Sequence, residues 1–558
     1  MYIQKHNFRF AFVFFSFLAF LFICSIKLIF LQVVKYSEFT QIAKEQHEHF
    51  IELESIRGRI LDRHEAPLAF NVAVHSLYAN PRMMTQASKE KAVKELPKIL
   101  NIDPSFIKKR LLKDKYFVWL KRKIKLDVKN EVERLKIRGL SFQKESQRYY
   151  PNGSLAAHVV GFANIDNEGQ EGIELFYNKM LKGTTGRMQV LRDAQQRDLM
   201  LESSMISPVN GFNLVLTIDE TIQYLAEKFL GEAFKENKAK SGTIIVMDVK
   251  TGEILALANR PTYSLDNFGR STIESRTNRA ISHIYEPGSI FKIVALSAAL
   301  EEDAFEENDQ IFCENGEYRV GNHILHDHKP HGMLSFQEVF ELSSNIGVTK
   351  VAERLGPAII YKYAKRFRFG MNTNIDLRGE VNGWLKKPSL WSKTTIGAIP
   401  IGHEVTTTPL QMVSALSAIA NDGVYMQPFM VKYIKDNAGN TIRSFNPRVV
   451  DRVISQSTAR RVQKILTGVV ARGTGTRAQI DGVLVAGKTG TAQKVINGRY
   501  SHSKYYASFM GFAPADNPRL AAIVVFDEPH PRYFGGTVSA PVFKEVIERS
   551  LKYLETSH

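Results

Sequence analysis

The stretch YEPGSIFKIVALSAAL, residues 285–300, places Ser289 and Lys292 three positions apart at the start of an apolar run. The proline and glycine before the serine interrupt any preceding element, so a helix is predicted to begin at Ser289 and continue to about Leu300. Residues three apart share a helix face, which brings the Lys292 amine within reach of the Ser289 hydroxyl.

The pattern alone leaves two interpretations of this pair open. If Lys292 is buried, desolvation lowers its pKa and leaves a neutral amine that can take the proton of Ser289. Alternatively, Ser289 caps the helix and the lysine extends along the surface to solvent. The same spacing recurs in polar or lysine-rich surroundings, which predict solvated helix faces or a loop, at Ser88/Lys91, Ser105/Lys108 and Ser501/Lys504.

Two further motifs follow in chain order. ELSSNIGVTK places Ser343 and Asn345 in an SxN arrangement that begins 54 residues after Ser289. LVAGKTGTAQK supplies a lysine, two hydroxyls and a glycine, at Lys488, Thr489, Gly490 and Thr491. An activated serine needs a proton route, an oxyanion hole and a group that holds the substrate. Isolated copies, SxN at Ser444 and KTG at Lys250, are predicted to lie in a loop and at a hairpin turn.

The hydrophobic pattern around these motifs predicts the fold class. From Gly211, GFNLVLTIDETIQYLAEKFL is typical of a strand followed by an amphipathic helix, and SGTIIVMDVKTGEILALAN of a hairpin. Apolar helices are expected at 289–300 and 335–355, and late strands in YYASFMGFAP and RLAAIVVFDEP. We therefore expect an antiparallel sheet built from both ends of the domain with helices packed on it, α/β in the broad sense (α+β).

The N-terminus carries a predicted membrane span. Residues 10–31 are apolar except for Lys27, and as a helix they would extend about 33 Å. The alternative, a cleavable signal peptide, would have a shorter apolar stretch and a small-residue cleavage site, neither of which is evident. Basic residues ahead of the span favour a cytoplasmic tail at 1–9 and export of the rest. The organisation predicted after the span is a lysine-rich module at 36–211 and a catalytic domain at 212–558.

Composition is consistent with this plan. The 558 residues are 44% hydrophobic and 23% charged, which is typical of globular proteins. The net charge of +17 allows nucleic acid, an anionic membrane or a polyanionic wall as partner, and the predicted span argues against nucleic acid. Cys24 lies inside the span and Cys313 outside it, so they cannot pair within one chain.

Serine-lysine, SxN and KTG motifs in this order resemble the penicillin-recognising serine enzymes. Wider segments resemble class B penicillin-binding proteins over nearly the whole chain, and among these the septal peptidoglycan D,D-transpeptidases of the penicillin-binding protein 3 type. The segments are RGRILDRHEAPLA (57–69), RYYPNGSLAAHVVGFANIDNEGQEGIE (148–174), EPGSIFK, TTPLQMVSALSAIANDGVYMQP (407–428) and YFGGTVSAPVF (533–543). The resemblance implies one anchor, an elongated non-catalytic pedestal of the dimerisation type at 36–211 and a transpeptidase domain at 212–558.

The resemblance also implies roles for the motif residues. Ser289 would be the acylated nucleophile, Lys292 its general base and Ser343 a proton relay. Asn345 would bind the donor peptide's amide, and the backbone amides of Ser289 and Thr491 would form the oxyanion hole. The substrate carboxylate would be held by the KTGT segment, which comprises Lys488, Thr489, Gly490 and Thr491.

The implied reaction is two acyl transfers, in which a D-alanyl-D-alanine stem peptide acylates the serine and the amine of a neighbouring stem takes the acyl group. Inhibition by β-lactams and partnership with a separate membrane glycosyltransferase and other division proteins would follow, with the catalytic domain outside the bacterial cytoplasmic membrane. The alternatives left open are an elongation-type class B transpeptidase and a catalytically silent scaffold or penicillin sensor. A class A enzyme would need a second catalytic domain, and a β-lactamase would be much shorter.

Two features depart from simple expectation. His403 and Glu404 stand in IGHEVTTTPLQ where the family usually has a glycine, as does Glu65 in DRHEAPLA.

GNHILHDHKPHG concentrates potential metal ligands, but without helical or finger spacing, so a polar loop is favoured over a zinc site. The implied reaction needs neither a metal nor a cofactor. The loop residues in question are His323, His326, Asp327, His328 and His331.

Overall fold

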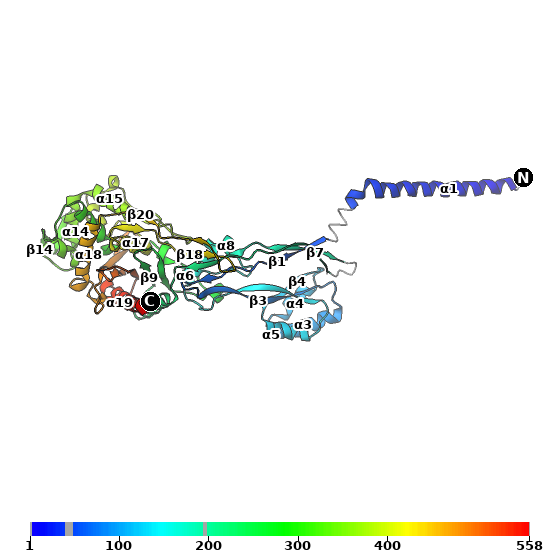
Figure 1. Ribbon diagram of the computed structural model, residues 1–558, viewed down its shortest axis with the longest axis horizontal. Coiled ribbons are helices and arrows are strands. Elements are labelled where there is room, and N and C mark those ends of the chain that lie inside the picture. Colours follow the sequence, from blue (N-terminus) through cyan, green and yellow to red (C-terminus); the bar gives the residue numbers. More distant parts are fainter. Residues whose placement is uncertain (1–2, 40–47, 193–197, 557–558) are drawn as a thin grey trace. The chain divides into compact units, whose positions relative to one another are not determined.

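A computed structural model describes residues 3–39, 48–192 and 198–556 of the chain (Figure 1). The chain divides into two compact units, each built from two segments. The smaller unit comprises Met1–Ile56 and Gly183–Asn210, and the larger comprises Arg57–Lys182 and Gly211–His558.

The smaller unit contains a long apolar helix. α1 (Ile3–Ile29) continues into a π-helical turn at Phe30–Val34. The segment Phe8–Val34 is 27 residues long and apolar enough to cross a membrane. A helix of this length extends about 40 Å, more than the hydrocarbon core requires. The predicted span at 10–31 therefore lies within one continuous helical segment.

The smaller unit also contains an antiparallel sheet of three strands in the order β1–β6–β7. β1 (Glu48–Leu53) pairs with β6 (Gly186–Arg192), which pairs in turn with β7 (Asp198–Ile206). Segments separated by more than a hundred residues are thus joined by backbone hydrogen bonds.

The larger unit is organised around a five-stranded antiparallel sheet in the order β10–β9–β23–β22–β21. The predicted early hairpin lies beside the predicted late strands, because β9 pairs along its whole length with β23. This confirms the predicted sheet built from both ends of the domain. The strands are β9 (Ser241–Asp248), β10 (Ile254–Arg260), β21 (Ala486–Ile496), β22 (Arg499–Ala513) and β23 (Leu520–Asp527).

Both faces of this sheet are buried. Ile244 and Val246 belong to the core formed with α9 (Glu220–Glu236) and α19 (Gly535–Thr556), whereas Ile245 belongs to the core around α17. Successive strand residues point to opposite faces, so a continuous apolar run serves two cores. Burying each such side chain contributes about 1.5–3 kcal/mol.

The helices over the second face differ from expectation in detail. The predicted helix at 289–300 begins as a 3₁₀ turn, Gly288–Lys292, before the α-helix proper. The predicted helix at 335–355 is broken, because Ser343 adopts a φ of 64°. The helices are α12 (Ile293–Glu301), α13 (Phe336–Glu341), α14 (Asn345–Leu355), α15 (Pro357–Arg366), α17 (Pro409–Ala420) and α18 (Gln456–Ala471).

A second sheet has the strand order β19–β18–β8–β2–β3–β4, with β5 paired to β3. β8, the strand predicted at the start of the catalytic domain, joins this sheet instead of the central one, because its backbone pairs with β18 and, in parallel, with β2. The strands are β2 (Ile60–Leu61), β3 (Pro67–Ala79), β4 (Val118–Ile124), β5 (Leu140–Tyr149), β8 (Asn213–Leu216), β18 (Val431–Lys435) and β19 (Thr441–Ser444).

Three helices pack around β3, β4 and β5 with their own apolar core (Figure 1). They are α3 (Gln86–Leu100), α4 (Pro104–Leu111) and α5 (Leu126–Arg134). The serine-lysine pairs at 88/91 and 105/108 lie on α3 and α4, as their lysine-rich surroundings predicted. Glu65 adopts a φ of 67°, a left-handed conformation that favours glycine, and forms an ion pair with Lys435.

The remaining elements are short connectors. The helices are α6 (Ala157–Val160), α7 (Gly172–Phe176), α8 (Asn178–Lys182), α10 (Ile273–Arg276), α11 (Arg279–Ser282) and α16 (Thr395–Ala398). The strands are β11 (Gln310–Phe312), β12 (Glu317–Val320), β13 (His323–His326), β14 (Met333–Ser335), β15 (Trp384–Leu385), β16 (Val405–Thr406), β17 (Val424–Met426) and β20 (Val449–Arg452).

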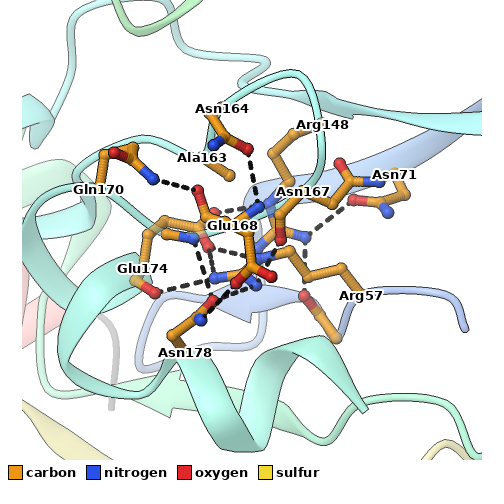
Figure 2. A network of polar contacts seen from close by, with 12 residues as sticks. Arg57, Asn71, Arg148, Ala163, Asn164, Asn167, Glu168, Gln170, Glu174 and Asn178 are labelled. Atoms are coloured by element: carbon orange, nitrogen blue, oxygen red, sulfur yellow. Dashed lines mark hydrogen bonds and ion pairs between the residues drawn. The ribbon is translucent and has the colours of Figure 1, made fainter. Parts of the chain in front are cut away.

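Two buried arginines share one buried glutamate near the start of β2 (Figure 2). Glu174 of α7 accepts from Arg57 Nε at 2.6 Å through one carboxylate oxygen and from Arg148 Nε at 2.6 Å through the other. Burial by itself raises the pKa of Glu174, but the two guanidinium groups outweigh burial and lower it. Arg57 also donates to the Asn178 side chain at 2.7 Å and to the Asn167 carbonyl at 2.9 Å. The network joins segments more than a hundred residues apart.

Replacing Glu174 by Gln should destabilise the protein by about 3–5 kcal/mol, because two buried guanidinium groups would lose their counter-charge. The measurement is chemical unfolding of the full-length chain in detergent, followed by intrinsic fluorescence. Asp114→Asn is the matched control: it breaks the exposed Arg82–Asp114 ion pair and should leave the unfolding curve unchanged. Equal curves for wild type and Glu174→Gln would contradict the role given to this network.

Candidate active site

Ser289 lies in a tight turn held between two other segments. Gly288 adopts a φ of 59°, and its N–H donates to the carbonyl of Gly402 at 3.1 Å. On the other side a Cβ at Gly288 would lie 3.0 Å from the Cβ of Ala492, so glycine lets strand β21 approach closely. The half-buried Ser289 lines a cleft of about 660 Å³.

Lys292 is fully buried behind this cleft, with 0% of its surface exposed. Its Nζ lies 2.7 Å from the Ser343 carbonyl oxygen, 2.8 Å from Asn345 Oδ1 and 3.2 Å from Ser343 Oγ. Burial lowers the pKa of Lys292 to about 7, and the carboxylate of Asp327 partly opposes the shift. This amine is therefore substantially neutral at physiological pH, as the buried-base interpretation requires.

Lys488 on β21 is buried in the same place. Its Nζ donates to Ser343 Oγ at 2.8 Å, so two lysine amines approach one hydroxyl. Burial lowers the pKa of Lys488 well below its usual value, and the neighbouring Lys292 adds to the shift. Two adjacent ammonium groups in a dry site repel each other, which disfavours double protonation.

Ser343 and Asn345 are held by the turn between α13 and α14. Ser344 caps α14, with its Oγ accepting from the Gly347 N–H at 2.9 Å. Asp327 accepts from the backbone N–H of Asn345 at 2.5 Å and from Ser344 Oγ at 2.6 Å. A carboxylate at a helix N-terminus satisfies free amides and favours the helix dipole. The histidine-rich loop thus fixes the position of the SxN motif.

The KTGT segment forms another part of the cleft wall. Thr489 Oγ1 lies 2.7 Å from Thr474 Oγ1, and Thr491 Oγ1 accepts from the Gly535 N–H at 3.1 Å. A Cβ at Gly490 would lie 2.3 Å from Ser508 Oγ and 3.1 Å from the Pro287 carbonyl oxygen. The missing side chain therefore lets β21 pack directly against the turn that carries the serine.

The structure brings all eight predicted site residues together. Ser289, Ser343, Asn345, Thr489 and Thr491 line the cleft, with the two lysines behind Ser343 and Gly490 between its threonine neighbours. One predicted contact is absent: in the described part of the chain no hydrogen bond joins Lys292 to Ser289. The three contacts of the Lys292 amine go to Ser343 and Asn345 instead, which is all that an amine can accommodate.

The isolated motif copies lie elsewhere. Lys250 is at the β9–β10 turn, as predicted, whereas the prediction of a loop at Ser444 is wrong, because that serine is the last residue of β19. The prediction of a loop at Ser501 is wrong, because the segment pairs with β21 as part of β22. Within the described ranges, no group of three or more His, Cys, Asp or Glu side chains is arranged to hold a metal ion. His326, Asp327 and His328 line the cleft instead.

Several cleft residues were missed from the sequence. Tyr505 stacks on Tyr533 with ring centroids 4.3 Å apart, and His328 contacts Phe534 at 5.0 Å. These rings come from the loop before β14, from β22 and from the segment before α19, so no local spacing relates them. The YFGG segment, noted for its resemblance, was the one available signal. The missed lining residues include His326, Asp327, His328, Thr474, Thr476, Arg477, Tyr505, Tyr533, Phe534 and Gly536.

Comparison with known families gives two matches. Residues 242–548 match the Penicillin binding protein transpeptidase domain, and residues 52–216 match the Penicillin-binding Protein dimerisation domain. The chain is 34% identical to the probable peptidoglycan D,D-transpeptidase PenA of Neisseria gonorrhoeae, over 99% of this chain and 94% of that protein. It is 34% identical to the peptidoglycan D,D-transpeptidase FtsI of Escherichia coli (strain K12), over 88% and 82%.

Solved structures share the fold. A peptidoglycan synthetase from Bifidobacterium adolescentis superposes with a TM-score of 0.74 at 26% identity, covering 91% of this chain and 97% of that one. Penicillin binding protein 3 from Mycobacterium tuberculosis, complexed with aztreonam, gives a TM-score of 0.71 at 28% identity, covering 90% and 97%.

We expect benzylpenicillin to acylate Ser289, at a rate that depends on the free-base fraction of Lys292. Because burial lowers its pKa to about 7, the rate should fall roughly tenfold per pH unit below that value and level off above it. Stopped-flow or quenched-flow measurement of the acylation rate of the full-length chain, from acid pH to above pH 7, tests this dependence. A profile with its midpoint near the ordinary lysine pKa would contradict the assignment.

Asp327→Asn should move that midpoint to lower pH. The carboxylate raises the pKa of Lys292, so its removal lets burial depress the pKa further. The plateau rate should also fall, because Asn offers one carboxamide oxygen where the carboxylate accepted from both Asn345 and Ser344. Asp303→Asn, on the surface, is the control. A midpoint that stays fixed or rises would count against the electrostatic role of Asp327.

Proposed function

Since the chain belongs to the class B penicillin-binding proteins, we propose that it is a peptidoglycan D,D-transpeptidase in which Ser289 is the acylated nucleophile. One observation carries the assignment: a buried lysine with a pKa near 7 contacts the SxN motif directly beside a cleft serine. This is the arrangement that a serine nucleophile needs, since an ordinary protonated lysine cannot accept its proton.

In the first step, Lys292 takes the Ser289 proton as Oγ attacks the carbonyl of the penultimate D-alanine. Ser343 then carries a proton to the departing amine. A neutral lysine has one lone pair, and Lys488 already donates to Ser343 Oγ, so the Ser343 hydroxyl is free to donate to Lys292. In the resting protein the chain of hydrogen bonds therefore runs from Lys488 through Ser343 to Lys292, and the lone pair of Lys292 becomes available to the Ser289 proton when the Ser343 hydroxyl turns toward the bound substrate's departing amine. Asn345 holds the donor peptide's amide, and the amides of Ser289 and Thr491 receive the developing oxyanion.

The substrate carboxylate completes this electrostatic arrangement. Lys488, whose pKa is depressed in the free protein, regains its charge when a carboxylate binds beside Thr489 and Thr491. The charge on Lys488 in turn disfavours a proton on Lys292, because the two amines share Ser343. Binding of the correct substrate thus helps to produce the neutral base.

Residues 10–31 serve as a single cytoplasmic-membrane anchor, with the N-terminus inside and the catalytic domain outside. In this organisation 1–9 is the cytoplasmic tail, 36–211 the non-catalytic pedestal and 212–558 the transpeptidase domain. The two family matches, at 52–216 and 242–548, support this division without fixing its boundaries.

The cross-links are made in the septum. The FtsI name of the Escherichia coli relative supports this, although another relative, 34% identical over 94% of this chain and 82% of its own length, is the stage V sporulation protein D of Bacillus subtilis. Glycan strands come from a separate membrane glycosyltransferase acting with other division proteins. The bound aztreonam in the Mycobacterium tuberculosis structure supports β-lactams as inhibitors.

The decisive experiment is incubation of the detergent-solubilised full-length chain with benzylpenicillin, followed by intact and peptide mass spectrometry. One stable adduct is expected on the peptide containing Ser289, absent from Ser289→Ala and strongly reduced in Lys292→Ala. Ser501→Ala, which alters an isolated serine-lysine pair outside the cleft, should keep the adduct. An adduct on another residue, or none on a folded wild-type chain, would exclude the assignment.

A further inference from the structure

A glutamate and a histidine form a second reactive pair beside the nucleophile. His403 Nδ1 lies 2.8 Å from Glu286 Oε2. The other oxygen of Glu286 accepts from the Glu404 N–H at 3.0 Å and from the Tyr500 hydroxyl at 3.3 Å. Both carboxylate oxygens are thus engaged, and the imidazole ring packs edge-on against Tyr500 with centroids 4.9 Å apart. The ring position is therefore well defined.

The pair is next to Ser289 in space as well as in sequence. Glu286 is three residues before the nucleophile, and a Cβ at Gly402 would lie 2.1 Å from the Gly288 carbonyl oxygen. His403 lines the same cleft as Ser289. Neither Glu286 nor His403 belongs to the machinery assigned above to acylation, which uses Lys292 and Ser343.

The hydrogen bond to Glu286 determines which imidazole nitrogen is available. A neutral histidine that donates from Nδ1 to a carboxylate keeps its lone pair on Nε2. Among the described residues Nε2 has no hydrogen-bond partner. The proton on Nδ1 is assigned from this geometry, since a carboxylate can only accept.

The charged groups nearest to His403 are Glu286 and the adjacent Glu404. Glu286 is 15% exposed and faces the imidazole directly. Burial, and after it the charge of Glu286, raises the pKa of Tyr500, so this phenol stays protonated and donates its hydrogen bond. Glu404, the next residue, is neutralised by Lys386 at 2.8 Å. The other titratable groups of the cleft wall are His326, Asp327, His328, Arg477, Tyr505 and Tyr533, with the two catalytic lysines behind it.

We propose that His403, oriented by Glu286, is the base that takes a proton from the acceptor amine in the second half of the reaction. This rests on the proposed function and names the acceptor subsite within it. The ligand class is a primary amine that arrives as an ammonium ion. Glu286 is a positioning residue, since it acts through the imidazole.

The acceptor ammonium gives one proton to His403 Nε2, and its nitrogen then attacks the acyl-ester carbonyl. The C–N bond forms, the bond from carbon to Ser289 Oγ breaks, and the second amine proton returns to Oγ through Lys292. His403 releases its proton to solvent. The products are an amide cross-link and the free serine.

The test separates the two halves of the reaction in the full-length chain in detergent. Acylation is measured with benzylpenicillin, and aminolysis with a D-alanyl thioester donor and glycinamide as the acceptor. His403→Gln should slow aminolysis about a hundredfold near neutral pH while leaving acylation within about twofold. Above the pKa of glycinamide the defect should narrow, because the amine then arrives already neutral. Glu286→Gln should show a smaller loss with the same recovery.

His502→Gln is the matched control, since His502 lies two residues from Tyr500 on β22 but does not line the cleft. Equal losses of acylation and aminolysis in His403→Gln would show a structural role and overturn the inference. Unchanged aminolysis, or a defect that persists at high pH, would also overturn it. Failure of the wild type to form any adduct on Ser289 would instead refute the proposed function itself, and the inference with it.

Discussion

The burial of two lysine amines around one hydroxyl is the interaction on which this site depends. Lys292 and Lys488 both reach Ser343 Oγ, at 3.2 and 2.8 Å, with almost no access to water. In such surroundings a charged amine loses its hydration, and two charged amines also repel. The site therefore holds a neutral base at physiological pH, which an exposed lysine could not provide.

This unfavourable arrangement is maintained by rigid neighbours. The serine turn, the SxN turn and strand β21 come from three distant parts of the chain, and each is fixed by packing or capping. Gly288 and Gly490 let the turn and the strand meet closely, and Asp327 ties the start of α14 to the histidine-rich loop. The sheet beneath is buried on both faces, so β21 has little freedom to move.

In a second buried cluster, burial and neighbouring charges again set the pKa, but here the buried group keeps its charge. Glu174 is surrounded by Arg57 and Arg148, and their attraction outweighs the burial that would otherwise neutralise the carboxyl group. Beside Ser289, burial prevails because Asp327 only partly opposes it at Lys292, and at Lys488 the neighbouring lysine adds to it. The cluster around Glu174 therefore joins distant segments through ion pairs, whereas the cluster around Lys292 keeps an amine in its neutral form.

Local patterns were enough to predict the apolar span and the β9–β10 hairpin, because each depends on residues close in sequence. The antiparallel sheet was predicted from the order of the strands along the chain, and the eight site residues from the order of three motifs and their resemblance to a family. The break at Ser343, the pairing of β8 with β18 and the β-structure at Ser501 were not predictable, since long-range backbone pairing and packing override local preference. The same holds for Asp327 at the N-terminus of α14 and for Glu286 beside His403. Sequence motifs identify which groups are present, but burial and proximity, which set their pKa and partners, arise when distant segments pack together.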